Sequence, residues 1–398
     1  MQAQQVLHKL MMNTCADMHK IRRQALEANV FAALTGRRLT VTDLGRAITS
    51  QTTQKHSIKR TDRLLSNPHL HKECITIHRA LAHQLVGAQK RPIVLIDWSD
   101  MDGYKQHFLL RAALAGEGRS MTLYDQVHTL GSKEKLLTHR QFLLQLKTLL
   151  PDGCKPILVT DAGFRTTWFK LIESMGWDWV GRVRNRHHMR WMRGGPWFNA
   201  KRCYEKATSR PACLGEGILT RSNQLPCRFV VYKGKLQGRK DKNIMGDVAR
   251  NQRSLKHAAG QREPWLLATS LQENSTMAKK VVQVYRLRMQ IEEGFRDIKS
   301  HRFGLSLAYH RTSSVERLQV LLLISTLAIV ILWLLGMAVV LREEHYQFQA
   351  NSVRNKKVLS VVFIGLQMIY DTRTRLSEKD IEAAWEQLHA IQQQRYVD

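Results

Sequence analysis

The stretch RPIVLIDWSD, Arg91 to Asp100, decides the fold. Its centre is an uninterrupted apolar run with β-branched residues, and it ends in carboxylates, which is the pattern of a buried β-strand. A second run of this kind, KPILVTDAGF from Lys155 to Phe164, ends in Asp161. Because acids follow both apolar strands, the sequence predicts an α/β domain with carboxylates at strand ends.

The segments around these two strands fit a mixed sheet. HFLLRAALAGEGRSMTLYDQVHTL, residues 107–130, predicts two strands joined by a turn at residues 116–118. THRQFLLQLKTLLPDG predicts a helix capped by Thr138 and stopped by Pro-Asp-Gly. TTWFKLIESMGW, residues 166–177, predicts a second helix, and EPWLLATS, residues 263–270, a return to the sheet. Strand–strand and strand–helix units of this order are typical of α/β folds.

Residues 183–262 do not continue this order of strands and helices. RVRNRHHMRWMRGGPWFNAKR and GKLQGRKDKN are rich in Arg, Lys, Gly and Trp, and RFVVYKGKL reads as a strand. We therefore expect an inserted, β-rich and basic subdomain.

Residues 1–75 read as short helices, among them LTVTDLGRAI and SIKRTDRLLSN. Lys59, Arg60 and Arg63 fall on or near one face of the second of these, as in a helix-turn-helix-like DNA reader. A basic helical bundle is the alternative. At the other end of the chain, we expect a basic loop, an apolar segment near residues 358–369 and a last helix that begins at Ser377.

One segment has the length and composition of a membrane span. No charged residue occurs from Leu318 to Leu341, between Arg317 and Arg342. Three polar residues interrupt the segment and basic residues flank both ends, which gives little orientation bias. A helix buried in a large core is equally apolar all round. We expect a core helix and no membrane association.

The overall charge of the chain points to a polyanionic partner. Its 398 residues carry 62 Lys and Arg against 33 Asp and Glu, a formal net charge of +29. Such self-repulsion is relieved when phosphates are neutralised, so nucleic acid is the expected partner and an anionic membrane surface the rival. The six cysteines show no zinc or disulfide spacing, and no signal peptide begins the sequence, so we expect a cytosolic protein with reduced thiols.

YRLRMQIEEGFRDIKS, residues 285–300, sets two adjacent glutamates in this basic chain. On one ideal helix, which advances about 100° per residue, four residues fall within about 60° of each other. They are Tyr285, Arg288, Glu292 and Lys299. On this helix Glu292 lies at the edge of a buried face and Glu293 points to solvent or DNA. Glu292 is therefore the candidate for chemistry, with an ion-pair role as the alternative.

Asp97, Asp161 and Glu292 form a candidate metal centre. Three carboxylates brought together repel each other unless divalent cations lie between them. Oxygen ligands favour Mg²⁺, with Mn²⁺ as a substitute, and two such ions suit in-line attack on a phosphodiester. Asp97 ends the apolar run directly, whereas we assign Asp100 and Asp102 to the turn that follows. Arg288 and Lys299 are then placed to hold phosphates, and Tyr285 to donate a hydrogen bond to one.

These motifs resemble the insertion-sequence-4 family of bacterial DDE transposases. Tyr285, Arg288, Glu292 and Lys299 match that family's Tyr-Arg-Glu-Lys signature, and DWSD at Asp97 and VTDAGF at Asp161 resemble its other acid motifs. The resemblance extends over nearly the whole chain. It implies a ribonuclease-H-like catalytic domain and cut-and-paste transposition, with hydrolytic nicking, hairpin formation by the freed 3′-hydroxyl, hairpin opening and strand transfer.

The resemblance also implies a division of the chain and of its roles. We expect a helical DNA-binding domain over 1–75, the catalytic domain over 76–182 and 263–341, the β-rich insertion over 183–262, and a helical dimerisation region over 342–398. Trp265 matches the family's tryptophan that receives a base displaced during hairpin formation. Its alternative role is core packing.

Expected partners are the terminal inverted repeats and target DNA, bound by a homodimer, with no small-molecule substrate. The expected location is the bacterial cytoplasm, associated with the nucleoid. A structure-specific nuclease of the same fold and an inactive DNA-binding repressor remain as alternative functions.

Overall fold

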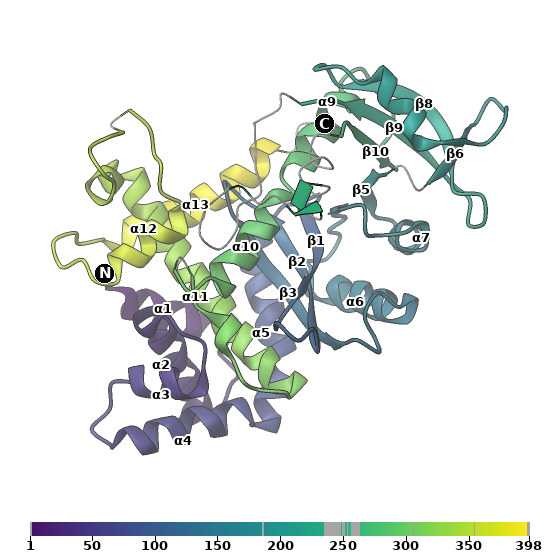
Figure 1. Ribbon diagram of the computed structural model, residues 1–398. Coiled ribbons are helices and arrows are strands. Elements are labelled where there is room, and N and C mark those ends of the chain that lie inside the picture. Colours follow the sequence, from purple (N-terminus) through teal and green to yellow (C-terminus); the bar gives the residue numbers. More distant parts are fainter. Residues whose placement is uncertain are drawn as a thin grey trace. The chain divides into compact units, whose positions relative to one another are not determined.

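The computed structural model describes residues 2–184, 187–234, 248, 251–252, 254–255, 263–302, 304–353 and 355–395. The fold is mixed α/β, and it divides into two compact units (Figure 1). One unit comprises Met1–Pro156 and Met289–Asp398, and the other comprises Ile157–Arg288. We call them the first and the second unit. The predicted GKLQGRKDKN segment lies almost wholly outside the described residues.

The first unit contains a three-stranded antiparallel sheet. It consists of β1 (Ile93–Asp100), β2 (His107–Ala115) and β3 (Ser120–Thr129), with β2 paired to both neighbours. The predicted turn at residues 116–118 joins β2 to β3, as expected. Burial along β1 ends at Ile96, but the strand itself continues to Asp100. Asp97 therefore lies within the strand rather than at its end, and Asp100 belongs to the strand rather than to the turn.

Helices precede and follow this sheet. The N-terminal segment forms α1 (Ala3–Thr14), α2 (Lys20–Gly36), α3 (Val41–Ala47), α4 (Gln54–Leu65) and α5 (Pro68–Val86). Helix α6 (Leu136–Leu149) follows β3. The prediction that Thr138 caps this helix is wrong: Lys135 is the N-cap, and the buried Thr138 hydroxyl donates to the Ser132 carbonyl at 2.8 Å.

The two faces of the β1–β3 sheet are covered by different elements. On one face, Tyr124 stacks on Phe142 of α6 and contacts His78 of α5. On the other face, Arg111 of β2 lies 5.2 Å from the ring centroid of Phe295, which belongs to α10 (Met289–Lys299). The sheet is therefore covered by α5 and α6 on one side and by α10, the helix of the glutamates, on the other.

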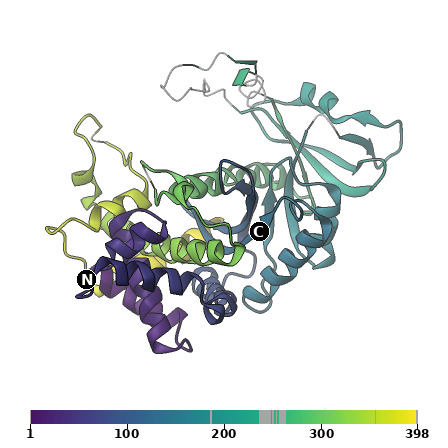
Figure 2. The same cartoon turned by 60° about the horizontal axis from the view of Figure 1, so that its bottom comes forward.

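Helix α11 (Val315–Leu341) is the core helix that the sequence predicts. In its most apolar 18-residue window, 94% of the residues are buried. It contacts α1, α2, α4 and α5, the purple and blue helices in Figure 2, as well as β3. It is long and apolar enough to cross a membrane, but this burial identifies it as the core of the first unit.

The C-terminal segment packs on α11. It forms η2 (Leu307–Tyr309) before α11, then η3 (Glu344–Phe348), α12 (Val361–Met368) and α13 (Glu378–Arg395). A Cβ on Gly336 of α11 or on Gly365 of α12 would collide with a backbone carbonyl of the facing helix. Glycine is therefore what allows this close approach. As predicted, Ser377 begins the last helix, and its hydroxyl accepts from Asp380 N at 3.2 Å.

The second unit is built on one sheet with the order β4-β5-β10-β9-β8-β6-β7. Its strands are β4 (Ile157–Thr160), β5 (Asp178–Val183), β6 (His188–Trp191), β7 (Phe198–Asn199), β8 (Ala212–Leu219), β9 (Leu225–Tyr232) and β10 (Trp265–Thr269). Among the described strands of this unit, β4 and β5 alone pair in parallel, and the helix α7 (Thr166–Ser174) joins them. The strands of the predicted insertion, with η1 (Ala200–Lys206), continue this sheet through β9.

The predicted continuous helix through residues 285–299 is wrong. Helix α9 (Met277–Arg286) ends the second unit, and α10 begins the first unit again at Met289. At Leu287 and Arg288 the backbone makes i→i−3 hydrogen bonds, from Leu287 N to Val284 O and from Arg288 N to Tyr285 O, both 3.1 Å. The helical wheel therefore grouped residues of α9 (Tyr285), of the turn after it (Arg288) and of α10 (Glu292 and Lys299), and these belong to two units.

Candidate functional site

The predicted site residues divide between the units. Asp97, Glu292 and Lys299 belong to the first, and Asp161, Trp265, Tyr285 and Arg288 to the second. Among the described residues, no group of three or more His, Cys, Asp or Glu side chains is already gathered as a metal site. The geometry below is therefore given within each unit.

Asp97 lies at the point of β1 where burial gives way to partial exposure. Its Oδ1 accepts from the backbone N of Trp98 at 2.8 Å. Its cross-strand neighbour is Arg111, and the neighbour of Arg111 on β3 is Asp125. Directly opposed residues of antiparallel strands point to the same face. Acid, arginine and acid thus form one polar row across the three strands.

Helix α10 is fixed to this sheet by polar contacts. The Gln290 amide makes two hydrogen bonds with the backbone of Gly116: its Oε1 accepts from N at 2.9 Å and its Nε2 donates to O at 2.7 Å. Arg119 donates through Nε to Asp297 Oδ2 at 2.5 Å. Burial raises the pKa of Asp297, although Arg119 acts in the opposite direction. The buried face of α10 is therefore partly polar, with each polar group paired.

The two glutamates have positions different from those predicted. Glu292 is exposed, whereas the Glu293 side chain is only 31% exposed and lies in ion pairs with Arg119, at 3.7 Å, and with Arg296. The prediction that Glu293 points freely to solvent is thus wrong. Glu293 is thus held in ion pairs, and Glu292 is the more exposed of the two glutamates.

Lys299 joins the end of α10 to β1. Its ammonium donates to Ser99 Oγ at 2.5 Å and to the Asp100 carbonyl. Burial, followed by the nearby charge of Arg111, lowers the pKa of Lys299 to about 8, while Asp100 and Asp97 act to raise it. Lys299 is therefore hydrogen-bonded to β1, the strand that carries Asp97, and the charge of Asp97 acts on the Lys299 ammonium.

Asp161 follows β4 directly, as predicted from the second apolar run. It is half-buried, and its Oδ1 accepts from Gly163 N at 2.7 Å, which holds the carboxylate in a tight turn. The same turn brings Gly163 so close that a Cβ there would lie 3.0 Å from Asp161 Oδ1.

An aromatic and basic cluster occupies the same unit as Asp161. Tyr285 is 4% exposed, and its ring lies edge-on to Trp265 with centroids 5.0 Å apart. Trp265 is half-buried and also contacts Tyr232, at 5.7 Å. Burial raises the pKa of Tyr285, while Arg288 and Arg182 lower it and Asp161 adds to the rise. The phenol, both guanidiniums and the acid therefore share one electrostatic environment.

Arg182 is the member of this cluster that the sequence analysis missed. It lies on β5, its side chain is 13% exposed, and its nearest ionic partner is Glu263 at 3.9 Å. Among the described residues, its Nε and Nη2 are buried without a hydrogen-bond partner. The available signal was a charged residue inside a buried strand, DWVGRV.

The N-terminal basic residues lie on α4. Lys59, Arg60 and Arg63 are all exposed, and Arg60 also donates to the Gln24 carbonyl at 3.4 Å. Helix α3 crosses α4 so closely that a Cβ on Gly45 would collide with the backbone of Ile58. The two helices thus form a tight pair that presents a basic face.

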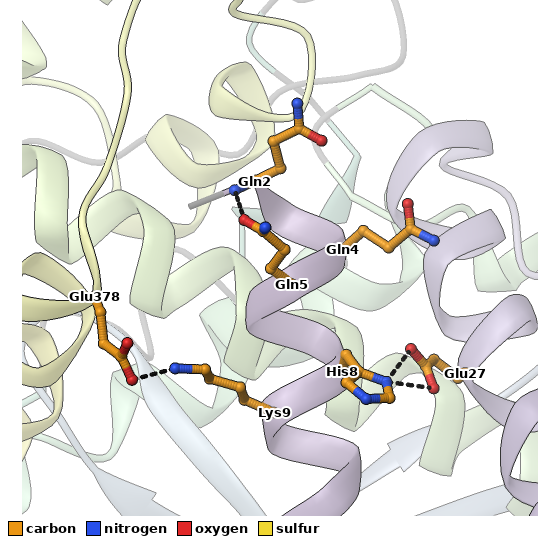
Figure 3. A pocket seen from close by; sticks show the side chains of 7 residues that line it. All are labelled: Gln2, Gln4, Gln5, His8, Lys9, Glu27 and Glu378. Atoms are coloured by element: carbon orange, nitrogen blue, oxygen red, sulfur yellow. Dashed lines mark hydrogen bonds and ion pairs between the residues drawn. The ribbon is translucent and has the colours of Figure 1, made fainter.

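A hollow of about 540 Å³ lies elsewhere in the first unit, between α1, α2 and α13 (Figure 3). His8 contacts Glu27 at 3.1 Å there, and Lys9 pairs with Glu378. None of the predicted site residues lines it.

The family comparison covers the part of the chain that contains all three acids. The profile described as the transposase DDE domain matches residues 88–331. The chain belongs to this family. It is a DNA transposase, an enzyme of DNA transposition and recombination. DDE transposases act on DNA with divalent metal ions, generally Mg²⁺.

The chain is also similar to one solved transposase structure, at low sequence identity. A cryo-EM structure of a piggyBac transposase synaptic complex with hairpin DNA has a TM-score of 0.40 and 12% sequence identity to the transposase. The match covers 91% of this chain and 76% of that one. No curated protein matches the sequence.

Proposed function

We propose that the transposase carries out cut-and-paste transposition through Asp97, Asp161 and Glu292. The supporting observation is the position of these acids: one on a strand where burial ends, one in a turn that follows a strand, and one exposed on a helix packed against the first strand. They offer only oxygen donors, which suits two Mg²⁺ ions, with Mn²⁺ as a substitute. The bound ions would supply an activated nucleophile and charge stabilisation at the scissile phosphate.

The basic residues near the acids would hold the DNA. Arg288 and Arg182 would bind the terminal phosphates, because guanidinium groups match phosphate oxygens in pairs. Tyr285 would donate to a phosphate oxygen from its buried position. Lys299, held beside β1, would place its ammonium at the strand that carries Asp97.

Hairpin formation and base displacement follow from this assignment. The freed 3′-hydroxyl would attack the opposite strand, and the strained duplex end would release a base from the stack. Trp265 would receive this base. Its support is its half-buried ring, held by Tyr285 and Tyr232, with one part of the indole still exposed.

The remaining parts of the chain would serve assembly and recognition. Lys59, Arg60 and Arg63 on α4 would contact the terminal inverted repeats, within a DNA-binding region over 1–75. The catalytic ribonuclease-H-like domain would span 76–182 and 263–341, with the insertion at 183–262. Residues 342–398 would support the homodimer that joins two ends and target DNA in the bacterial cytoplasm. In sequence the chain resembles the transposase of the tetracycline-resistance composite transposon, in the insertion-sequence-4 family.

The test is incubation of the full chain with linear DNA that carries the ends flanking its coding sequence, with and without Mg²⁺. Wild type should produce nicked, hairpin and excised DNA only with the metal ion. Asp97→Asn should bind the ends without cutting, because it keeps the shape of the side chain and removes one metal ligand. Asp100→Asn is the matched control on the same strand and should cut like wild type.

The other outcomes decide between the alternatives. Cutting without hairpins or joining would identify a structure-specific nuclease, and binding without any cutting by wild type would identify a repressor. Equal cutting by wild type and Asp97→Asn would remove Asp97 from the site.

A further inference from the structure

The polar row on the β1–β3 sheet contains an ion pair that the reaction does not require directly. Arg111 donates through Nε to Asp125 Oδ1 at 2.7 Å and through Nη2 to Asp125 Oδ2 at 2.6 Å. The two side chains are 3% and 1% exposed. An ion pair removed so completely from water costs desolvation energy that an apolar pair would avoid. A stability role alone is therefore a weak reason for its presence.

Arg111 occupies the position between the two acids of the row. Its direct neighbour on β1 is Asp97, and its direct neighbour on β3 is Asp125. Cβ atoms of directly opposed residues are about 5 Å apart, so an arginine can reach the acid on either side. The bidentate geometry commits two of its nitrogens to Asp125.

The surroundings hold the guanidinium in that orientation. Phe295 of α10 lies over it, 5.2 Å from ring centroid to Cζ. Gly294 lies beside Nη1, where a Cβ would make an ordinary van der Waals contact at 3.9 Å. The strand β3 is itself irregular next to Asp125, with a register shift whose Leu123 carbonyl contacts buried His78 at 3.1 Å. The guanidinium is thus held by Phe295 as well as by Asp125.

We infer that Asp125 is a positioning residue that binds Arg111 and so keeps this arginine from forming an ion pair with Asp97. This inference rests on the proposed role of Asp97 as a metal ligand. A guanidinium bound to Asp97 would compete with a divalent cation for the same oxygens. Asp125 prevents this competition while the positive charge of Arg111 stays in the row, one strand away from the ligand.

The test measures Mn²⁺ binding to the full chain without DNA, from the electron paramagnetic resonance signal of the free ion. Asp125→Asn releases Arg111 and should weaken Mn²⁺ binding by about 10- to 100-fold, the usual effect of changing a residue that orients a metal ligand. The double variant R111M/D125L removes the arginine as well and should restore binding to about the wild-type value. Thermal melting of the same samples shows that the variants are folded.

Two results would overturn the inference. One is unchanged Mn²⁺ binding in folded Asp125→Asn, and the other is a double variant that binds as weakly as the single one, since both would leave the pair with a structural role only. If Asp125→Asn does not fold, Arg111→Lys decides the question. Its ammonium makes a point contact instead of a fork, and it should weaken Mn²⁺ binding by about 10-fold; unchanged binding contradicts the inference.

Asp97→Asn distinguishes this result from a failure of the proposed function. It should lose Mn²⁺ binding in the same assay. If it binds Mn²⁺ like wild type, Asp97 is not a metal ligand, and the inference fails together with that assignment. If it loses binding while Asp125→Asn retains it, only the inference about Asp125 fails.

Discussion

Helices α9 and α10 follow each other in the sequence but differ in how they are held. Helix α9 ends in an aromatic cluster, where the buried Tyr285 packs on Trp265. Helix α10 is held by polar contacts, from Gln290 to Gly116 and from Lys299 to Ser99. One sequence signature spans both helices. Its spacing, although compatible with one helix, therefore joins two separately attached helices and not one continuous helical face.

The largest expected difference lies within α10, between its two glutamates. Glu292→Gln should lower Mg²⁺-dependent DNA cleavage about 1,000-fold or more, because a metal ligand contributes several kcal/mol to the transition state. Glu293→Gln should leave cleavage close to wild type and lower the free energy of unfolding by about 1 kcal/mol or less, since it removes partly exposed ion pairs. Cleavage rates and melting curves of both variants check this. If Glu293→Gln loses cleavage and Glu292→Gln keeps it, Glu293 is the catalytic glutamate.

The polar attachment of α10 predicts the next largest effect, on stability. Gln290→Ala leaves the buried N–H and C=O of Gly116 without their partner, which should lower the free energy of unfolding by about 1–3 kcal/mol. Gln283→Ala changes the same residue type at an exposed position of α9 and should stay within about 0.5 kcal/mol of wild type. Urea unfolding measures both. Equal effects would mean that α10 does not depend on this contact.

The attachment of α10 through Lys299 should make the stability of the protein depend on pH. Its pKa is about 8 in the folded protein, mainly because of burial, against an ordinary value of 10.5. The unfolded chain thus holds more protons on this group between pH 8 and pH 10.5, so its contribution to stability rises with pH in that window. The melting temperature of wild type minus that of Lys299→Met should therefore increase from pH 8 to pH 10. A difference that does not change with pH contradicts the assignment.

The smallest effect is expected at the end of α9. Tyr285→Phe keeps the ring contact with Trp265 and removes the hydrogen bond with Arg288, so the free energy of unfolding should fall by about 0.5–1.5 kcal/mol. Binding of the terminal DNA should weaken as well, if the phenol donates to a phosphate. Melting curves and a DNA-binding titration separate the two effects. A variant that binds the ends like wild type would limit Tyr285 to packing.

Much of the fold could be predicted from local pattern. The apolar runs located β1 and β4, the turn at residues 116–118 separated β2 from β3, and the uncharged segment became the core helix α11. Asp97 and Asp161 became candidates because each directly follows an apolar run in the sequence. These features depend on neighbours in the sequence, so periodicity is enough to detect them.

The errors arose where contacts distant in sequence decide the result. Nothing in Leu287 or Arg288 marks a helix end, since neither is glycine or proline. A helical wheel also treats polar residues as exposed, but Gln290 and Asp297 are buried because Gly116 and Arg119 pair with them. This shifted the buried face of α10 and gave Glu293 the wrong environment. Arg182 was missed for the same reason, since its neighbours come from separate segments.

The burial of α11 has a consequence for how the chain is synthesised. Before folding, this helix would expose an uncharged apolar segment of membrane-spanning length, which insertion machinery can bind. Its partners α1, α2, α4 and α5 precede it in the chain, whereas α12 and α13 follow it. Part of the surface that buries α11 is therefore synthesised before this helix, and α12 and α13 complete it afterwards.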